Sequence, residues 1–356
     1  MKGLGRAVVV SQQKVREEPG RTDCKNKNKT AVLLATGFLD DSTAFVLDFP
    51  DQCVGFFLAD NCYDVWIGNF RGSTLYGKRA INASLQESPD FWAFSFHQFG
   101  VYDLPALIDH VLVQTYQQQL LYVGMFQAAF NFLVMMSERP EYNDKVKAAL
   151  FLTPLYRAQH VRFPFPKLLF TVAEGITAAM YNANNREAFP KNTPLSMMAS
   201  QACEHGDDFL CAWAADVALN LESEHLNKSR ISVYLCQIPT GTSVLNLVHA
   251  YQVSVRNSFQ TLDCTLIADK PEFCGPVRKY KIKNTKVSVG IIHSTGDTLV
   301  PPEDVMILVS DLGDVVKFRH QINDSNFGQL NFRTAAFIMK KYVLKPMLSF
   351  FRQYGK

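Results

Sequence analysis

The sequence of 356 residues has no apolar run of the roughly 18 residues that a membrane-spanning helix needs. The longest candidate follows Gly124, and Gln127 and Asn131 interrupt it. The apolar run nearest to the first residue is too short for a secretory leader, so we expect no signal peptide in the chain as it stands. The sequence therefore predicts no transmembrane span and leaves peripheral contact with a lipid surface open.

Most of the chain also lacks a surplus of charge of either sign. The net charge is +3, but residues 1–30 hold eight Lys/Arg against three Asp/Glu, so the remainder is slightly acidic. We interpret residues 1–30 as a basic, poorly ordered arm, with attraction to phosphate or a membrane surface as the alternative. A near-neutral body predicts no nucleic-acid partner. No His-x-x-x-His or Cys-x-x-Cys spacing occurs, so the sequence predicts no metal site.

Cysteine and glycosylation signals are present and favour a secretory lineage. The chain has eight cysteines. Asn-x-Ser/Thr sequons occur at Asn28, Asn82, Asn227 and Asn323. Cys53 and Cys62 bracket a predicted helix and would stand roughly 13 Å apart, too far for a disulfide with each other. Cys264 and Cys274 could close a short loop, and this pairing is left open.

Buried-strand patterns alternate with helical ones in two parts of the chain. Apolar runs such as "TAVLLATG", "YDVWIGN" and "LLYVG" alternate with amphipathic segments such as "YDLPALIDHVLVQT". This rhythm breaks between residues 156 and 284 and resumes with "VSVGIIHSTGD". The pattern predicts an α/β fold with a mostly parallel, doubly wound sheet. We assign residues 31–155 and 285–356 to this core and residues 156–284 to an inserted, largely helical cap.

The stretch "QQLLYVGMFQAAFNF" predicts a buried strand that turns sharply into a helix. Hydrolases present a nucleophile on such a turn in the pattern Gly-x-Ser-x-Gly. Here the frame runs from Gly124 to Ala128 and places Phe126 where the serine would be. No second Gly-x-Ser-x-Gly occurs. Ser73 and Ser294 lie near predicted strand ends, but neither has a histidine in the right order.

Three long, collinear stretches resemble the acid lipases, the gastric and lysosomal-type lipases of the α/β-hydrolase superfamily. They are "GFLDDSTAFVLDFPDQCVGFFLADNCYDVWIGNFRGSTLYGKR", "FWAFSFHQFGVYDLPALIDHVL" and "YLCQIPTGTSVLNLVHAYQ". The resemblance implies an α/β-hydrolase fold and Ser–His–Asp hydrolysis of neutral lipids such as triacylglycerols and steryl esters. It also implies a secreted or lysosomal location and no metal or organic cofactor.

The resemblance transfers the catalytic triad to specific positions of this chain. The nucleophile falls on Phe126, whose phenyl ring has no lone pair to attack a carbonyl. The acid falls on Asp297, in "HSTGDTLVPPEDV". The base falls on Gln329, or on Phe327 if the gap is placed differently, and neither side chain exchanges protons near neutral pH.

Other features of the family transfer with fewer changes. The oxyanion hole would use the backbone N–H groups of Phe38 and Gln127, which survive side-chain substitution. Cys203 and Cys211 resemble the disulfide of the family's cap.

We therefore expect an acid-lipase-like pseudoenzyme that binds a neutral lipid or a fatty acyl ligand without cleaving it. One alternative is an active lipid-ester hydrolase with a rearranged site. Another is a protein-interaction scaffold. The sequence leaves the oligomeric state open.

Overall fold

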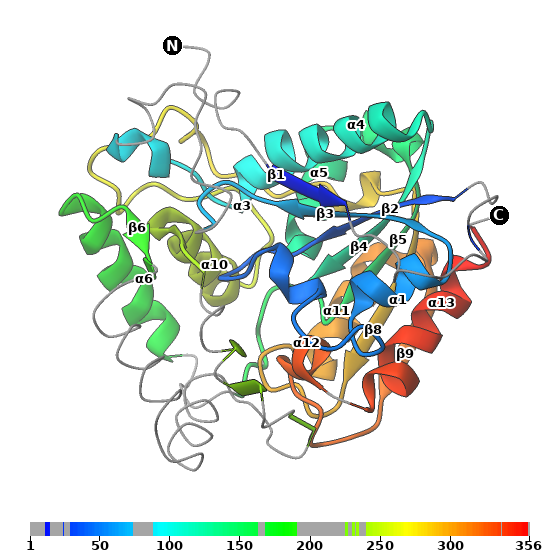
Figure 1. Ribbon diagram of the computed structural model, residues 1–356. Helices are drawn as coiled ribbons and strands as arrows, with labels where there is room; N and C mark the ends of the chain where they lie inside the picture. Colours follow the sequence, from blue (N-terminus) through cyan, green and yellow to red (C-terminus); the bar gives the residue numbers. More distant parts are fainter. Residues whose placement is uncertain are drawn as a thin grey trace.

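A seven-stranded sheet forms the centre of the computed structural model (Figure 1). The structure describes residues 11–14, 24, 29–73, 88–162, 168–190, 225–226, 230–231, 233–234, 240–335 and 337–354. The strands are β1 (Ser11–Lys14), β2 (Ala31–Ala35), β3 (Asp64–Asn69), β4 (Leu120–Met125), β5 (Val146–Leu152), β8 (Ser288–Ser294) and β9 (Val316–Ile322). They follow the order β1-β3-β2-β4-β5-β8-β9, and every neighbouring pair except β1–β3 is parallel. The predicted α/β fold class is confirmed.

Helices cover both faces of this sheet, as the continuously apolar strands require. One face packs on α3 (Phe96–Gln98), α4 (Leu104–Thr115), α5 (Ala128–Glu138) and α11 (Pro302–Leu312). The other packs on α1 (Val54–Asp60), α12 (Asn331–Thr334) and α13 (Lys345–Phe351). Figure 1 shows α4 and α5 on one side of the sheet and α1 and α13 on the other. Short 3-10 or π turns occur at Ser42–Phe45, Pro89–Trp92, Phe99–Asp103, Pro140–Lys145, Ile282–Asn284, Gly313–Val315 and Lys340–Leu344.

The N-terminal arm is attached to the core at two points. Strand β1 pairs antiparallel with β3, and Lys14 forms an ion pair with Asp64 at 2.8 Å. Cys24 forms a disulfide with Cys62, across a Cα–Cα distance of 5.3 Å. The interpretation of the arm as a poorly ordered tail is therefore wrong at these residues, because edge-strand pairing and a cross-link hold them. Cys53 is a free, buried thiol, which confirms that it does not pair with Cys62.

Part of the predicted cap forms a separate apolar cluster beside the sheet. Helices α6 (Leu168–Asn182) and α10 (Val244–Arg256) pack together with the two-stranded sheet of β6 (Glu187–Ala188) and β7 (Thr242–Ser243). Both helices lie to the left of the main sheet in Figure 1. Cys264 and Cys274 form a disulfide. The cap boundaries at residues 156 and 284 stay a prediction.

Several predicted modification sites lie outside the described residues. They are the Cys203–Cys211 pair and the sequons at Asn28, Asn82 and Asn227. Asn323 is described and exposed, directly after β9. No helix in the described part of the chain is both long enough and apolar enough to span a membrane.

Candidate functional site

The turn between β4 and α5 has the strained backbone expected of a nucleophile elbow. Phe126 lies between the last residue of β4 and the N-cap of α5, with a φ of 53°. This left-handed conformation is rare for a bulky residue, so the surrounding structure must impose it. The Phe126 N–H donates to the Leu152 carbonyl at 3.0 Å, and the Phe126 carbonyl accepts from the Ala129 N–H at 3.2 Å. Backbone hydrogen bonds thus hold the turn whatever side chain it carries.

Two glycines allow close approaches around this turn. A Cβ on Gly124 would lie 2.8 Å from the Tyr122 ring, which packs beneath the turn. A Cβ on Gly37 would lie 2.7 Å from the Gln127 Cβ. Contacts this short are not tolerated, so both positions require glycine. The loop after β2, which carries Phe38, therefore lies directly against the elbow.

The close contact between this loop and the elbow brings the two predicted oxyanion donors to one place. In the described part of the chain, the backbone N–H groups of Phe38 and Gln127 donate to no protein group. The rings of Phe38 and Phe126 meet edge to face, with centroids 6.1 Å apart. Phe38 also packs against the cap cluster. The site therefore combines two backbone donors with an apolar aromatic pair.

The elbow is also tied to the cap by a buried pair of amides. The side chains of Gln127 and Asn246 exchange two hydrogen bonds of 3.1 Å, and both residues are fully buried. Asn246 lies in the first turn of α10, where its backbone N–H donates to the Ser243 hydroxyl at 3.0 Å. The sequence analysis did not identify Asn246, although it lies in the quoted cap motif.

The predicted acid and base positions meet at a third side chain, Thr153. Thr153 directly follows β5, and its hydroxyl contacts the Asp297 carboxyl and lies 2.6 Å from the Gln329 Oε1. The other Asp297 oxygen accepts from the N–H groups of Leu299 and Val300 at 3.0 and 2.8 Å. Thr153 was not predicted as a site residue, although its place after a buried strand next to β4 was a usable signal.

The Thr153 hydroxyl has one hydrogen, so it cannot donate to both of its neighbours. Both contacts are satisfied if a protonated Asp297 donates to Thr153 and Thr153 donates to Gln329. With Asp297 ionised, Thr153 must donate to it, and Gln329 must turn its amide to donate in return. Burial raises the pKa of Asp297 to about 6, against the opposing effect of its hydrogen bonds from Thr153, Val300 and Leu299. Burial therefore keeps the Asp297 carboxyl protonated at a higher pH than an ordinary carboxyl group, although its hydrogen bonds favour the ionised form.

Gln329 rather than Phe327 occupies the position beside the acid. Phe327 is fully buried and packs its ring against Phe332 and Tyr342. Gln329 is also buried, and its Nε2 has no hydrogen-bond partner among the described residues. A buried amide donor without a partner is costly unless a ligand or water accepts from it.

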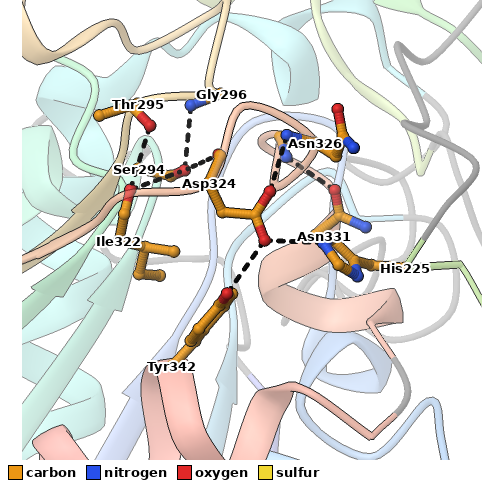
Figure 2. A network of polar contacts seen from close by, with 10 residues as sticks. His225, Ser294, Thr295, Gly296, Ile322, Asp324, Asn326, Asn331 and Tyr342 are labelled. Atoms are coloured by element: carbon orange, nitrogen blue, oxygen red, sulfur yellow. Dashed lines mark hydrogen bonds and ion pairs between the residues drawn. The ribbon is translucent and has the colours of Figure 1, made fainter.

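The loop that carries Gln329 is held by a network around Asp324 (Figure 2). The Asp324 carboxylate accepts from the Asn326 N–H at 2.9 Å, the Tyr342 hydroxyl at 3.0 Å and His225 Nε2 at 2.9 Å. Burial raises the pKa of Asp324, but these three hydrogen bonds outweigh it and the net shift is downward. His225 belongs to the predicted cap, so this pair links the cap to the loop. The sequence did not indicate this contact.

The alternative nucleophiles have no catalytic partner in the described residues. The Ser294 hydroxyl accepts from the Gly296 N–H at 3.1 Å and contacts the carbonyls of Ile322 and Asp324 (Figure 2). The Ser73 hydroxyl is buried without a hydrogen-bond partner in that part of the chain. No group of three His, Cys, Asp or Glu side chains able to hold a metal ion occurs among the described residues.

Known proteins with similar sequences are lipases. The chain is 30% identical to human gastric triacylglycerol lipase over 308 residues, which cover 82% of this chain and 74% of the relative. It is 31% identical to rat lysosomal acid lipase/cholesteryl ester hydrolase over 286 residues, covering 79% and 70%. It is 29% identical to human lipase member J over 307 residues, covering 84% and 82%. No protein-family model matches the chain.

Solved structures with the same fold have distant sequences. A lipase candidate from Sulfolobus solfataricus matches with a TM-score of 0.62 at 13% identity, covering 98% of this chain and 95% of the other. A soluble variant of monoglyceride lipase from Saccharomyces cerevisiae matches with a TM-score of 0.53 at 13% identity, covering 98% and 93%. These matches show the α/β-hydrolase fold, and the sequence relatives identify the branch within it. The chain belongs to the acid lipase family, the gastric and lysosomal-type lipases of the α/β-hydrolase superfamily.

Proposed function

We propose that this chain is a catalytically inactive acid-lipase homologue that binds a neutral lipid or a fatty acyl chain. The observation that carries the proposal is Phe126 at the strained turn between β4 and α5. A phenyl side chain cannot form an acyl-enzyme, because it has neither a lone pair nor a proton to exchange. The backbone of the turn nevertheless keeps the geometry that serves a nucleophile.

The base position supports inactivity independently. Gln329 cannot accept a proton from a nucleophile, and the Asp297 carboxyl contacts Thr153 instead of a histidine. Loss of the serine or the histidine alone costs roughly 10⁶ in turnover in subtilisin, about as much as loss of the whole triad. Two losses in one site leave at most the weak catalysis of an oxyanion hole, roughly 10³–10⁴ over water.

The hydrogen-bond donors and aromatic rings around the elbow favour ligand binding over a purely structural role. The backbone donors of Phe38 and Gln127 suit an ester or carboxyl oxygen, and the Phe38–Phe126 ring pair suits an acyl chain. Gln329 Nε2, which has no hydrogen-bond partner in the described part of the chain, offers a further donor. The names of the relatives specify triacylglycerol and cholesteryl ester, so a neutral ester is the ligand class to test first.

We also propose a secretory or lysosomal location. The disulfides Cys24–Cys62 and Cys264–Cys274 require an oxidising compartment to form. Asn323 is an exposed sequon that such a compartment would glycosylate. Peptide mapping under non-reducing conditions should recover both linked pairs from secreted protein, and free thiols at all four positions would contradict this location.

The test combines chemistry with ligand detection. Protein purified from a secretory host should not turn over p-nitrophenyl esters above buffer and should not react with a fluorophosphonate probe. Native mass spectrometry should detect a co-purifying lipid. A charge at the elbow, in Phe126→Asp, should abolish that lipid, while Phe337→Asp at a residue that is 90% exposed should not. Far-UV circular dichroism checks that both variants fold.

The outcomes separate the three hypotheses. Turnover or stoichiometric probe labelling would establish an active hydrolase with a rearranged site. Absence of both turnover and lipid in folded wild-type protein would favour the protein-interaction scaffold.

A further inference from the structure

A cavity of about 460 Å³, separate from the elbow, opens between the cap side and the core. Its lining comes from the loop after β5, the end of α10, the segment 279–284 and α11. None of the triad or oxyanion positions lines it. Its volume falls in the range of small-molecule sites, roughly 300–1,000 Å³.

The charged residues of this lining are mostly cations. Lys279, Lys281 and Lys283 are exposed at its edge, and Arg157 lies deeper. Among the described residues of the lining, the only acidic one is Asp311, whose carboxylate already accepts from Arg157 at 2.5 Å. In the described part of the chain, no carboxylate forms an ion pair with any of the three lysines.

The three lysines alternate along the chain with buried residues, and all three line the cavity. Tyr280 and Ile282, between them, are buried in the core, where Tyr280 packs against Phe259 with ring centroids 4.9 Å apart. The Tyr156 hydroxyl adds a hydrogen bond to Asp311 at 2.8 Å. The result is a cavity with an aromatic wall and an uncompensated positive rim.

Two polar groups in the lining have no partner. The Ser258 side chain is 8% exposed, and its hydroxyl makes no hydrogen bond to any described residue. The Arg157 Nε is likewise buried without an acceptor in that part of the chain. Buried donors are normally satisfied, so a ligand with several acceptor oxygens would complete this site.

We propose that this cavity binds a phosphate monoester. A phosphate carries close to two negative charges and three acceptor oxygens, which match several lysines and the donors of Ser258 and Arg157. A single carboxylate would leave most of these groups uncompensated. The wall of Phe259 and Tyr280 accommodates the organic part of the ester. The ester is either a soluble metabolite or a lipid headgroup, and the two sources need separate arms of one experiment.

Isothermal titration calorimetry with inorganic phosphate and glycerol 3-phosphate tests the shared chemistry. Both should bind at one site, glycerol 3-phosphate more tightly, and acetate at the same ionic strength should not. Flotation with phosphatidylcholine vesicles, with and without phosphatidic acid, tests the lipid source. Binding only to the vesicles with phosphatidic acid would assign a headgroup, and binding only to glycerol 3-phosphate would assign a soluble ester.

Matched variants locate the site. Lys279→Ala with Lys283→Ala should weaken binding about tenfold or more, since two charge-assisted contacts are lost. Lys317→Ala, at an exposed lysine outside the lining, should leave the affinity unchanged.

Ser258→Ala separates ligand binding from structure. Because the hydroxyl has no partner among the described residues, its removal should leave the melting temperature unchanged or higher, while the affinity falls. A lower melting temperature with unchanged affinity would make Ser258 purely structural and would overturn its role. No heat with either phosphate and no vesicle binding, or equal effects of Lys317→Ala and the double variant, would overturn the proposal as a whole.

Discussion

Under the proposed function, the elbow and the acid–base region of the site have diverged to very different extents. At the elbow, the side chain is lost but the backbone keeps its form, with φ of 53° at Phe126 and the N–H groups of Phe38 and Gln127 free of acceptors among the described residues. In the acid–base region, Asp297 is retained, yet Thr153 lies between it and Gln329 and occupies the hydrogen bond that a histidine would need.

The difference follows from what each part is made of. The elbow is held by main-chain hydrogen bonds and by the close approaches at Gly37 and Gly124, which do not depend on the nucleophile. The acid–base pair is a contact between side chains, so the loss of one partner lets a neighbour replace it. If catalysis has been lost as proposed, the oxyanion geometry has outlasted it, whereas the triad geometry has not.

The largest expected effect comes from restoring the triad. Phe126→Ser with Gln329→His supplies a nucleophile and a base, but Thr153 would still compete for Asp297. Adding Thr153→Ala frees the carboxylate, so the triple variant should exceed the double variant in p-nitrophenyl ester turnover. We expect a gain of about 10³-fold over wild type, because the oxyanion donors are already in place.

Single variants control this test, since nucleophile and base act as a unit and either one alone should change little. Placing the histidine at Phe327 in place of Gln329 should also fail, because Phe327 packs in the core. A folded triple variant without activity would show that the geometry of the elbow has also changed. The elbow and the acid–base region would then no longer differ in how far they have diverged.

The second effect concerns the charge of Asp297. Its pKa of about 6 in the folded protein exceeds the ordinary value of 3.8, so the folded state binds the proton more tightly. Asp297 therefore stabilises the folded state fully below about pH 4. This stabilisation is lost as the pH rises through about 6. Asp297→Asn mimics the protonated acid and should stabilise the protein at pH 7 by up to about 3 kcal/mol.

Urea denaturation between pH 4 and 8 measures this effect. Burial also raises the pKa of Asp40 to about 6, against the opposing charge of Arg333. The stability of the Asp297→Asn variant should therefore still depend partly on pH. Asp314→Asn, at an exposed position, controls for the change in net charge. A variant that loses stability at pH 7 would mean that the ionised carboxylate is what the site requires.

The third effect tests the strain at the elbow. Phe126→Ala removes a half-buried ring that packs against both core layers and should cost about 2 kcal/mol. Phe126→Gly removes the same ring but relieves the left-handed backbone, so it should be more stable than the alanine variant by about 1 kcal/mol. Equal stability of the two variants in urea would show that the turn stores no strain.

The sequence predicted the parts of the molecule that follow local rules. Periodicity identified β2, β3, β4 and β8 and the sharp turn at Phe126, because a buried strand and its turn are encoded within a few residues. The seventh strand, β1, was missed, since "SQQK" has no apolar pattern and forms only by pairing with β3.

The missed features of the site join residues far apart in sequence. Thr153 meets Asp297 across 144 positions, and His225 meets Asp324 across 99. Such polar contacts carry no periodic signal, because a single threonine or histidine is compatible with many environments. Their partners are decided by the fold, after the strands have brought their carboxyl ends together.

The smallest expected effect concerns the tie between the elbow and the cap. Gln127→Leu and Asn246→Leu each leave one fully buried amide without its partner, so each should cost about 1–2 kcal/mol. The double variant should cost less than the sum of the two by about 1 kcal/mol, the coupling expected of a direct pair. Gln252→Leu provides the control, because Gln252 bonds to Asp263 within the cap and should add independently to Gln127→Leu. Additive costs for Gln127 and Asn246 would mean that the cap does not support the elbow. The retained turn would then depend on the backbone hydrogen bonds of the core alone.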